Sequence, residues 1–154
     1  MKSALIALLA FCLCWGVGCS KNISEFESFE ETKTRAEKGD DIAQVNLGYM
    51  YANGEGVSQD LHEAAKWYRK AAEQGDVDAQ YNLGNMFRTG EGVLKDVVTA
   101  YTWYNIAVAN GNLTAEEYKP LIEKKMTAEQ IAEAEELFIE MVKKNPKLLK
   151  KKQN

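Results

Sequence analysis

The chain has 154 residues, 45% of them hydrophobic and 27% charged, which is enough for one ordinary globular domain and a targeting segment. Its formal net charge of −4 argues against nucleic acid as the main partner, because phosphate binding needs a basic face. All three cysteines lie before residue 20, which excludes a disulfide-stapled scaffold or a cysteine-ligated zinc site in the rest of the chain.

Residues 1–19 have the features of an export signal. Lys2 supplies a positive start, positions 4–15 are an apolar run, and positions 16–18 are small residues typical of a cleavage site. The apolar run is shorter than the ~20 residues that a transmembrane helix needs. We therefore expect this segment to be removed from an exported protein.

The end of this segment, Gly-Val-Gly-Cys at positions 16–19, resembles the lipobox of bacterial lipoproteins. The resemblance implies cleavage before Cys19, lipidation of Cys19 and, because Ser20 follows it, an outer-membrane location. The lipobox prefers leucine where Gly16 stands, so ordinary secretory cleavage near Gly18 is the alternative.

Residues 20–39 are predicted to be a polar spacer that leads into an N-terminal capping helix. Phe26, Phe29 and Ala36 fall on one helical face by their spacing. Such a cap is what a stack of repeats needs at its open end.

Residues 40–75 and 76–111 are two copies of one unit, offset by 36 residues throughout. A fixed period of this size is typical of a solenoid, in which each unit stacks on its neighbour. The matched positions include Ala43 and Ala79, Gly48 and Gly84, Gly54 and Gly90, Asp60 and Asp96, Trp67 and Trp103, and Gly75 and Gly111.

Each copy is predicted to be two antiparallel helices. Gly54 and Gly56 end the first helix, Asp60 caps the start of the second, and Gly75 ends it. The apolar stripe of the first helix is Ala43, Leu47, Met50 and Tyr51, and that of the second is Leu61, Ala64, Trp67, Tyr68 and Ala71.

The pattern from Ala43 to Gly75 is Ala-x3-Leu-Gly-x2-Tyr-x2-Gly-x-Gly-Val-x2-Asp-x3-Ala-x2-Trp-x3-Ala-x3-Gly. It resembles a Sel1-like repeat, a relative of the tetratricopeptide repeat. The resemblance implies an all-α fold, a short right-handed α-solenoid of two hairpins used as an interaction scaffold. Bacterial proteins of this kind are often secreted or associated with the cell envelope.

Residues 112–145 do not continue the repeat and are predicted to be C-terminal capping helices. We expect a short turn, then a helix from about Pro120 to Lys125 with the proline in its first turn. Thr127 and Gln130 form the capping box of a longer helix that Pro146 ends.

Residues 146–154 form a basic tail, within a stretch of twelve residues that holds six lysines and no acid. The tail could bind an anionic surface or an acidic partner. The interpretation that we favour is a frayed, solvated chain end.

The sequence shows no constellation of catalytic, cofactor-binding or metal-binding residues. His62 is the only histidine and has no nucleophile or second histidine near it, so it is expected to be a surface residue. The glycine pairs at 54/56 and 90/92 lack the lysine of a phosphate loop and recur with the repeat, which indicates a structural role.

Positions that differ between the two copies on the first helix of each are free for recognition. In tetratricopeptide-type stacking this helix lines the concave side, so the resemblance implies that six such residues point into a groove. Drift on a solvated face is the alternative. The six residues, called the candidate groove below, are Val45, Tyr49, Ala52, Tyr81, Asn85 and Arg88.

The function that these features favour is a non-enzymatic adaptor of the bacterial cell envelope, which binds a protein or peptide and no nucleic acid. It would be an outer-membrane lipoprotein facing the periplasm, held to the membrane through Cys19, or a soluble periplasmic protein. A β-lactam-binding or β-lactam-hydrolysing Sel1-like enzyme and a structural cell-wall-associated protein are the alternatives.

Overall fold

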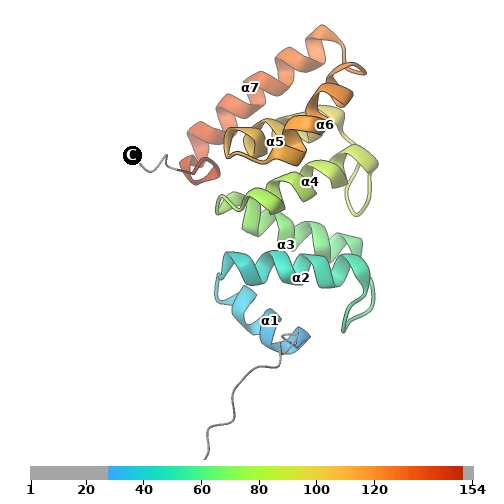
Figure 1. Ribbon diagram of the computed structural model, residues 1–154, viewed down its shortest axis with the longest axis vertical. Helices are drawn as coiled ribbons and strands as arrows, with labels where there is room; N and C mark the ends of the chain where they lie inside the picture. The colour runs from blue at the N-terminus through green and yellow to red at the C-terminus, as the bar shows by residue number, and fades with distance from the viewer. Residues whose placement is uncertain (1–27, 151–154) are drawn as a thin grey trace, which may run out of the picture.

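The computed structural model describes residues 28–150, which form a single stack of α-helices that rises from α1 to α7 (Figure 1). From α1 to α6 each helix packs against the next one in sequence, α7 packs against α5, and the described residues contain no strand. The predicted all-α solenoid is thus confirmed. The helices are α1 (Phe29–Glu37), α2 (Asp41–Asn53), α3 (Leu61–Glu73), α4 (Val77–Thr89), α5 (Val97–Ala109), α6 (Leu113–Glu123), α7 (Ala128–Lys144) and the short 3₁₀ helix η1 (Pro146–Leu148).

Aspartates begin all four helices of the two repeats. In each case the carboxylate accepts a hydrogen bond from a main-chain N–H of the first turn, which would otherwise lack a partner. Gly54 and Gly90 end α2 and α4 in the left-handed conformation that glycine adopts without strain. The helix limits inferred from the repeat therefore hold in both copies. The caps are Asp40, Asp60, Asp76 and Asp96.

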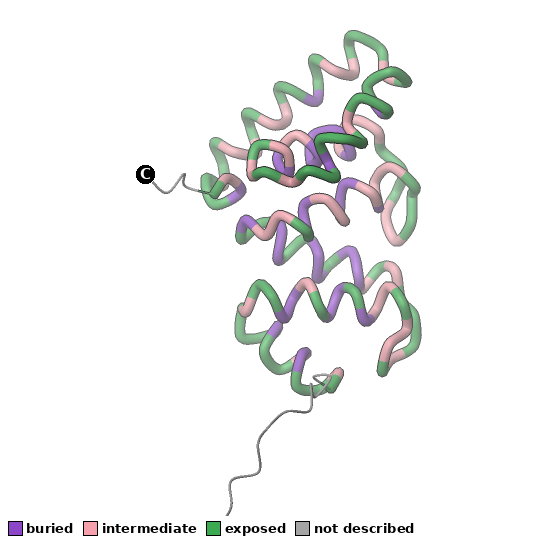
Figure 2. Tube along the Cα trace, in the orientation of Figure 1, coloured by how far each residue is buried: buried purple, intermediate pink, exposed green. Residues whose placement is uncertain are grey.

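Small residues bring the two helices of each hairpin close together. A Cβ atom at Gly48 would lie 2.8 Å from the ring of Tyr68, so the tyrosine packs directly on the main chain of α2. The alanines of the apolar stripes are fully buried along the inside of the stack, where Figure 2 shows the buried positions, and Trp103 fills the space beside them.

Helix α6 differs from the prediction, because it starts at Leu113 rather than near Pro120. Asn112 is its N-cap, and its side chain accepts from the Ala115 N–H. Pro120 lies inside the helix, where a proline costs about 3 kcal/mol or more. Burial of Ala115 and Ile122 against α5 offsets that cost, and this tertiary contact is not visible in the local sequence.

The C-terminal segment also differs from the favoured prediction of a frayed, solvated end. After α7, residues 146–150 turn back onto the stack, and the side chain of Leu148 is only 2% exposed within the core that includes Trp103 and Ile106. The prediction was wrong for these residues. It rested on the many lysines in the local sequence, whereas burial of one leucine, Leu148, holds the segment on the stack. Residues 151–154 lie outside the described part of the chain, as do residues 1–27, including Cys19 and Phe26.

Candidate binding surface

The candidate groove draws three residues from α2 and three from α4. Tyr49 is exposed over 53% of its surface, and the other five residues are half-buried. Val45 and Ala52 pack partly against the core between the repeats, so their side chains also serve the stack. The exposed chemistry of this face therefore comes from Tyr49 on α2 and from the α4 residues.

Asn85 and Arg88 of α4 form a polar cluster with Tyr104 of the next helix. The Asn85 side-chain oxygen accepts hydrogen bonds from the Tyr104 hydroxyl at 2.6 Å and from Arg88 Nε and Nη2 at 3.2 and 3.1 Å. These bonds fix the guanidinium beside Tyr104. No ion pair joins Arg88 to a carboxylate among residues 28–150. Its positive charge is thus held in place and left without a counter-charge from this part of the chain.

Tyrosines surround this cluster. The ring of Tyr81 lies 5.8 Å from that of Tyr104 and 6.3 Å from that of Tyr118 on α6. Tyr118 and Leu121 on α6 are exposed and extend the face beyond the second repeat. The sequence reasoning missed both residues, because α6 does not follow the 36-residue period and no signal marked its orientation.

The first repeat presents different chemistry at the same place. Tyr49 stands where the second repeat has Asn85, and Tyr68 stands where it has Tyr104. Burial raises the pKa of Tyr68 to about 12, with a smaller contribution from the nearby Tyr49. This end of the face is therefore neutral and phenolic. The face therefore changes from aromatic at α2 to cationic at Arg88.

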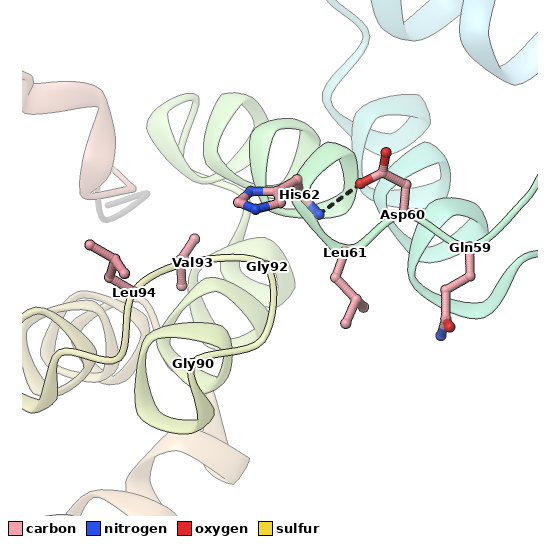
Figure 3. A pocket seen from close by; sticks show the side chains of 8 residues that line it. All are labelled: Gln59, Asp60, Leu61, His62, Gly90, Gly92, Val93 and Leu94. Carbon is pink, nitrogen blue, oxygen red and sulfur yellow. Dashed lines mark hydrogen bonds between the residues drawn. The ribbon is translucent and has the colours of Figure 1, made fainter.

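A shallow depression of about 520 Å³ lies between the loops of the two repeats, on another part of the surface (Figure 3). His62 borders it, and its main-chain N–H donates to Asp60 while its ring is exposed, as the sequence predicts for a surface residue. Gly92 packs so closely here that a Cβ atom would lie 2.1 Å from the Leu61 carbonyl oxygen, so its role is structural. The lining residues are Gln59, Asp60, Leu61, His62, Gly90, Gly92, Val93 and Leu94.

Within residues 28–150, no group of three or more His, Cys, Asp or Glu side chains is arranged to hold a metal ion. None of the described helices combines the length and the apolar character needed to cross a membrane.

Comparison with known families gives the Sel1 repeat, which matches residues 4–25, 41–76 and 77–112. The chain belongs to the Sel1 repeat family. The second and third matched segments coincide with the hairpins α2–α3 and α4–α5. The first segment, residues 4–25, lies outside the described residues and overlaps the stretch that we expect to be an export signal.

Two solved structures resemble this Sel1 repeat protein. The crystal structure of c5321, described as a protective antigen present in uropathogenic Escherichia coli strains and displaying an SLR fold, has a TM-score of 0.73 and 37% identity, covering 82% of this chain and 29% of that chain. A Sel1 repeat protein from Oxalobacter formigenes has a TM-score of 0.58 and 42% identity, covering 59% of this chain and 68% of that chain.

Two curated relatives match over shorter stretches. The secretory immunoglobulin A-binding protein EsiB of Escherichia coli O6:H1 is 41% identical over 44 residues, which are 29% of this chain. The chitin synthase regulator SKT5 of Saccharomyces cerevisiae is 33% identical over 73 residues, which are 46% of this chain. The chain spans only 9% and 10% of these two proteins, so it shares a repeat module with them rather than their whole architecture.

Proposed function

We propose that this protein is a non-enzymatic adaptor of the bacterial cell envelope that binds an acidic peptide segment of a partner protein on the candidate groove. Sel1 repeat proteins are generally protein-interaction modules, and extended faces of stacked helices suit peptide binding. Relatives described as an immunoglobulin-binding protein and a protective antigen support a role outside the cytoplasm.

The observation that carries this proposal is the state of Arg88. A half-buried guanidinium that two hydrogen bonds hold against Asn85 has lost part of its hydration, and no described carboxylate compensates it. A carboxylate of a partner would supply the missing charge through a charge-assisted hydrogen bond. The flanking rings of Tyr81 and Tyr118 offer rigid apolar contact area at low entropic cost.

In-cell photo-crosslinking tests the groove directly. A photo-reactive amino acid is placed at Tyr49 and at Tyr118, with His62 as the control outside the groove, and the products are identified by mass spectrometry. We expect one discrete acidic partner from the first two sites, lost when Arg88→Ala is added and absent at His62. Capture that is equal at all three sites, or unaffected by Arg88→Ala, would contradict the proposal.

The outer side of α1 supports the proposal that residues 1–19 are an export signal rather than part of a further repeat. The side of α3 that packs against α2 includes the buried residues Ala64, Trp67, Tyr68 and Ala71. The residues 36 positions earlier in the sequence are Ser28, Glu31, Thr32 and Arg35, of which only Thr32 is buried. This side of α1 is therefore more polar than the matching side of α3, which favours an export signal over a further repeat at residues 1–19.

Metabolic labelling with a radioactive fatty acid tests the proposed lipid anchor. The wild-type chain and Cys14→Ala should incorporate the label, and Cys19→Ala should not. Label in none of the three, with a mature chain that begins after Gly18, would favour the soluble periplasmic form.

The rival enzymatic function is tested with a chromogenic β-lactam. We expect the purified protein neither to hydrolyse nor to retain it. The described residues contain no cysteine, and the hydroxyl–carboxylate pairs Ser28–Glu31 and Thr99–Asp96 lie at exposed helix starts, where they serve as caps. Steady turnover would overturn the non-enzymatic part of the proposal, and retention on isolated cell wall without a protein partner would favour a structural role.

A further inference from the structure

Residues 145–150 lie across the stack with residues 146–148 in the single 3₁₀ turn η1, as a short peptide would lie in a binding site. Leu148 is the apolar anchor, and its main-chain oxygen accepts hydrogen bonds from Gln80 Nε2 at 2.9 Å and Asn110 Nδ2 at 2.7 Å. Asn110 Oδ1 in turn accepts from the Lys150 N–H at 2.8 Å. Two side-chain amides, called the amide pair below, thus bind the main chain at the leucine and two residues after it.

The first repeat has an equivalent pair that does not bind another segment. Gln44 and Gln74 occupy the matching positions, and Gln74 Nε2 donates to Gln44 and to the carbonyl oxygen of Gly39 in its own repeat. Asn110 is one methylene shorter than Gln74. Its Nδ2 keeps the equivalent bond, to Gln80 Oε1 at 2.8 Å, and also donates to the Leu148 main-chain oxygen. The second repeat thus exchanges the hydrogen bond to the preceding turn at Gly39 for one to a separate segment.

Charge at this edge of the stack is complementary to the segment. The carboxylates of Asp41 and Asp78 lie near that of Asp76, and the ammonium group of Lys150 acts on Asp76 with the opposite sign. The side chains of Lys147 and Lys150 remain exposed. A basic segment is therefore favoured here over an acidic one.

The site also has room that the segment leaves unfilled. A cavity of about 390 Å³ adjoins Leu148, lined by Glu73, Met141, Lys144, Asn145 and Leu148. The segment is short and is held by one buried side chain and a few hydrogen bonds. Such elements open at a lower free-energy cost than the helices of the core.

We propose that the amide pair Gln80–Asn110 is an exchangeable peptide-binding site, which the C-terminal segment occupies and which accepts a lysine-rich segment of a partner protein with one leucine anchor. The main-chain hydrogen bonds supply affinity, and the leucine pocket with its acidic surroundings supplies selectivity. The resident segment competes with a partner for the site. The apparent Kd of the partner is therefore its intrinsic Kd divided by the fraction of molecules in which the site is open.

A peptide with the sequence of residues 145–154, labelled with fluorescein, tests this proposal. Its fluorescence anisotropy is followed while the full chain is added. We expect weak binding to the wild-type chain and binding at least about ten-fold tighter to the Leu148→Ser chain, in which the resident segment has lost its anchor. A peptide with serine in place of its own first leucine should bind neither chain.

Gly75 and Gly39 provide matched control variants. Both have φ of 96°, so alanine strains the main chain equally at either position. A Cβ atom at Gly75 would lie 2.6 Å from the Lys147 carbonyl oxygen, whereas one at Gly39 would meet nothing within 4 Å. Added to Leu148→Ser, Gly75→Ala should abolish peptide binding and Gly39→Ala should preserve it.

Equal binding to the wild-type and Leu148→Ser chains, or equal effects of the two glycine variants, would overturn the proposal. If Leu148→Ser does not fold, the exposed pair Lys147→Glu and Lys150→Glu is used to weaken the resident segment, with the same expectation. A wild-type dimer that forms with rising concentration and is absent in Leu148→Ser would assign the site to the tail of a second copy, and so overturn the assignment to a separate partner.

Discussion

The side-chain amide of Gln80 donates to the main-chain oxygen of Leu148 at 2.9 Å, although 68 residues separate them. The same amide donates to the Ala72 carbonyl oxygen at 3.2 Å, so it links the hairpin interior to the C-terminal segment. Gln80 is fully buried, and these two main-chain oxygens satisfy its amide group, which would otherwise be buried without acceptors. Leu148 thus anchors the C-terminal segment to the core formed by the helices.

Replacement of Leu148 by alanine should therefore destabilise the whole solenoid. Burial of this side chain in the core predicts a loss of about 2–5 kcal/mol in the free energy of unfolding. Urea denaturation followed by circular dichroism measures it. Leu94→Ala, at a leucine that is 90% exposed, is the control and should change stability by no more than about 0.5 kcal/mol. Equal effects of the two variants would contradict burial of the segment.

Gly92 and Gly56 allow close packing to be separated from main-chain strain. Both have φ of 70°, which costs an alanine about 1–2 kcal/mol at either position. At Gly92 the new Cβ atom would also meet the Leu61 carbonyl oxygen at 2.1 Å, whereas at Gly56 the nearest atom is Phe29 Cβ at 3.3 Å. We expect Gly92→Ala to be the more destabilising by a further ~1–3 kcal/mol.

Thermal and urea unfolding of Gly92→Ala and Gly56→Ala, measured side by side, check this expectation. Indistinguishable midpoints would mean that the loop of the second repeat moves away from α3 at no cost.

Asp40 and Asp76 cap equivalent helices but should respond to pH in opposite ways. The Ala43 N–H, with help from Arg35, lowers the pKa of Asp40, whereas burial raises the pKa of Asp76. Asp40 therefore contributes stability above the ordinary pKa of 3.8, which is lost as pH falls through its lowered value. The contribution of Asp76 is instead lost as pH rises from 3.8 through its raised value.

The free energies of unfolding of Asp40→Asn and Asp76→Asn, measured from pH 3 to pH 7, test these signs. Asparagine keeps the capping oxygen and removes the charge. Relative to the wild type, the Asp40→Asn variant should become less stable as pH rises, and the Asp76→Asn variant should become more stable. Parallel curves for the two variants would show that the caps share one environment.

The hydrogen bond between Asn85 and Tyr104 should couple the two residues energetically. Asn85→Ala leaves the Tyr104 hydroxyl without its acceptor, at a cost of about 1–3 kcal/mol. Tyr104→Phe removes the donor as well, so the double variant should be less destabilised than the sum of the single ones. A double-mutant cycle on urea unfolding measures this coupling, and strict additivity would argue that the bond contributes nothing.

Export and lipidation at Cys19 and the binding role of the candidate groove stay predictions, since Cys19 lies outside the described residues and no partner is present. The groove residues themselves came from a comparison of the two repeats, and that comparison located Tyr81, Asn85 and Arg88 correctly on one helix. It could not show that Asn85 holds Arg88 or that Tyr118 approaches Tyr81, because these contacts depend on rotamers and on the orientation of α6.

The sequence alone determined the repeat, its two-helix unit, the aspartate caps and the glycine ends, because these depend on local chemistry that recurs every 36 residues. Tertiary structure alone decided the course of α6 through Pro120 and the return of residues 145–150 to the stack. Both are governed by the burial of a few apolar side chains against other helices. The chief ones are Ile122 of α6, which packs against α5, and Leu148, which packs against α3, α4 and α5. Neither a capping pattern nor a count of lysines carries information about such contacts.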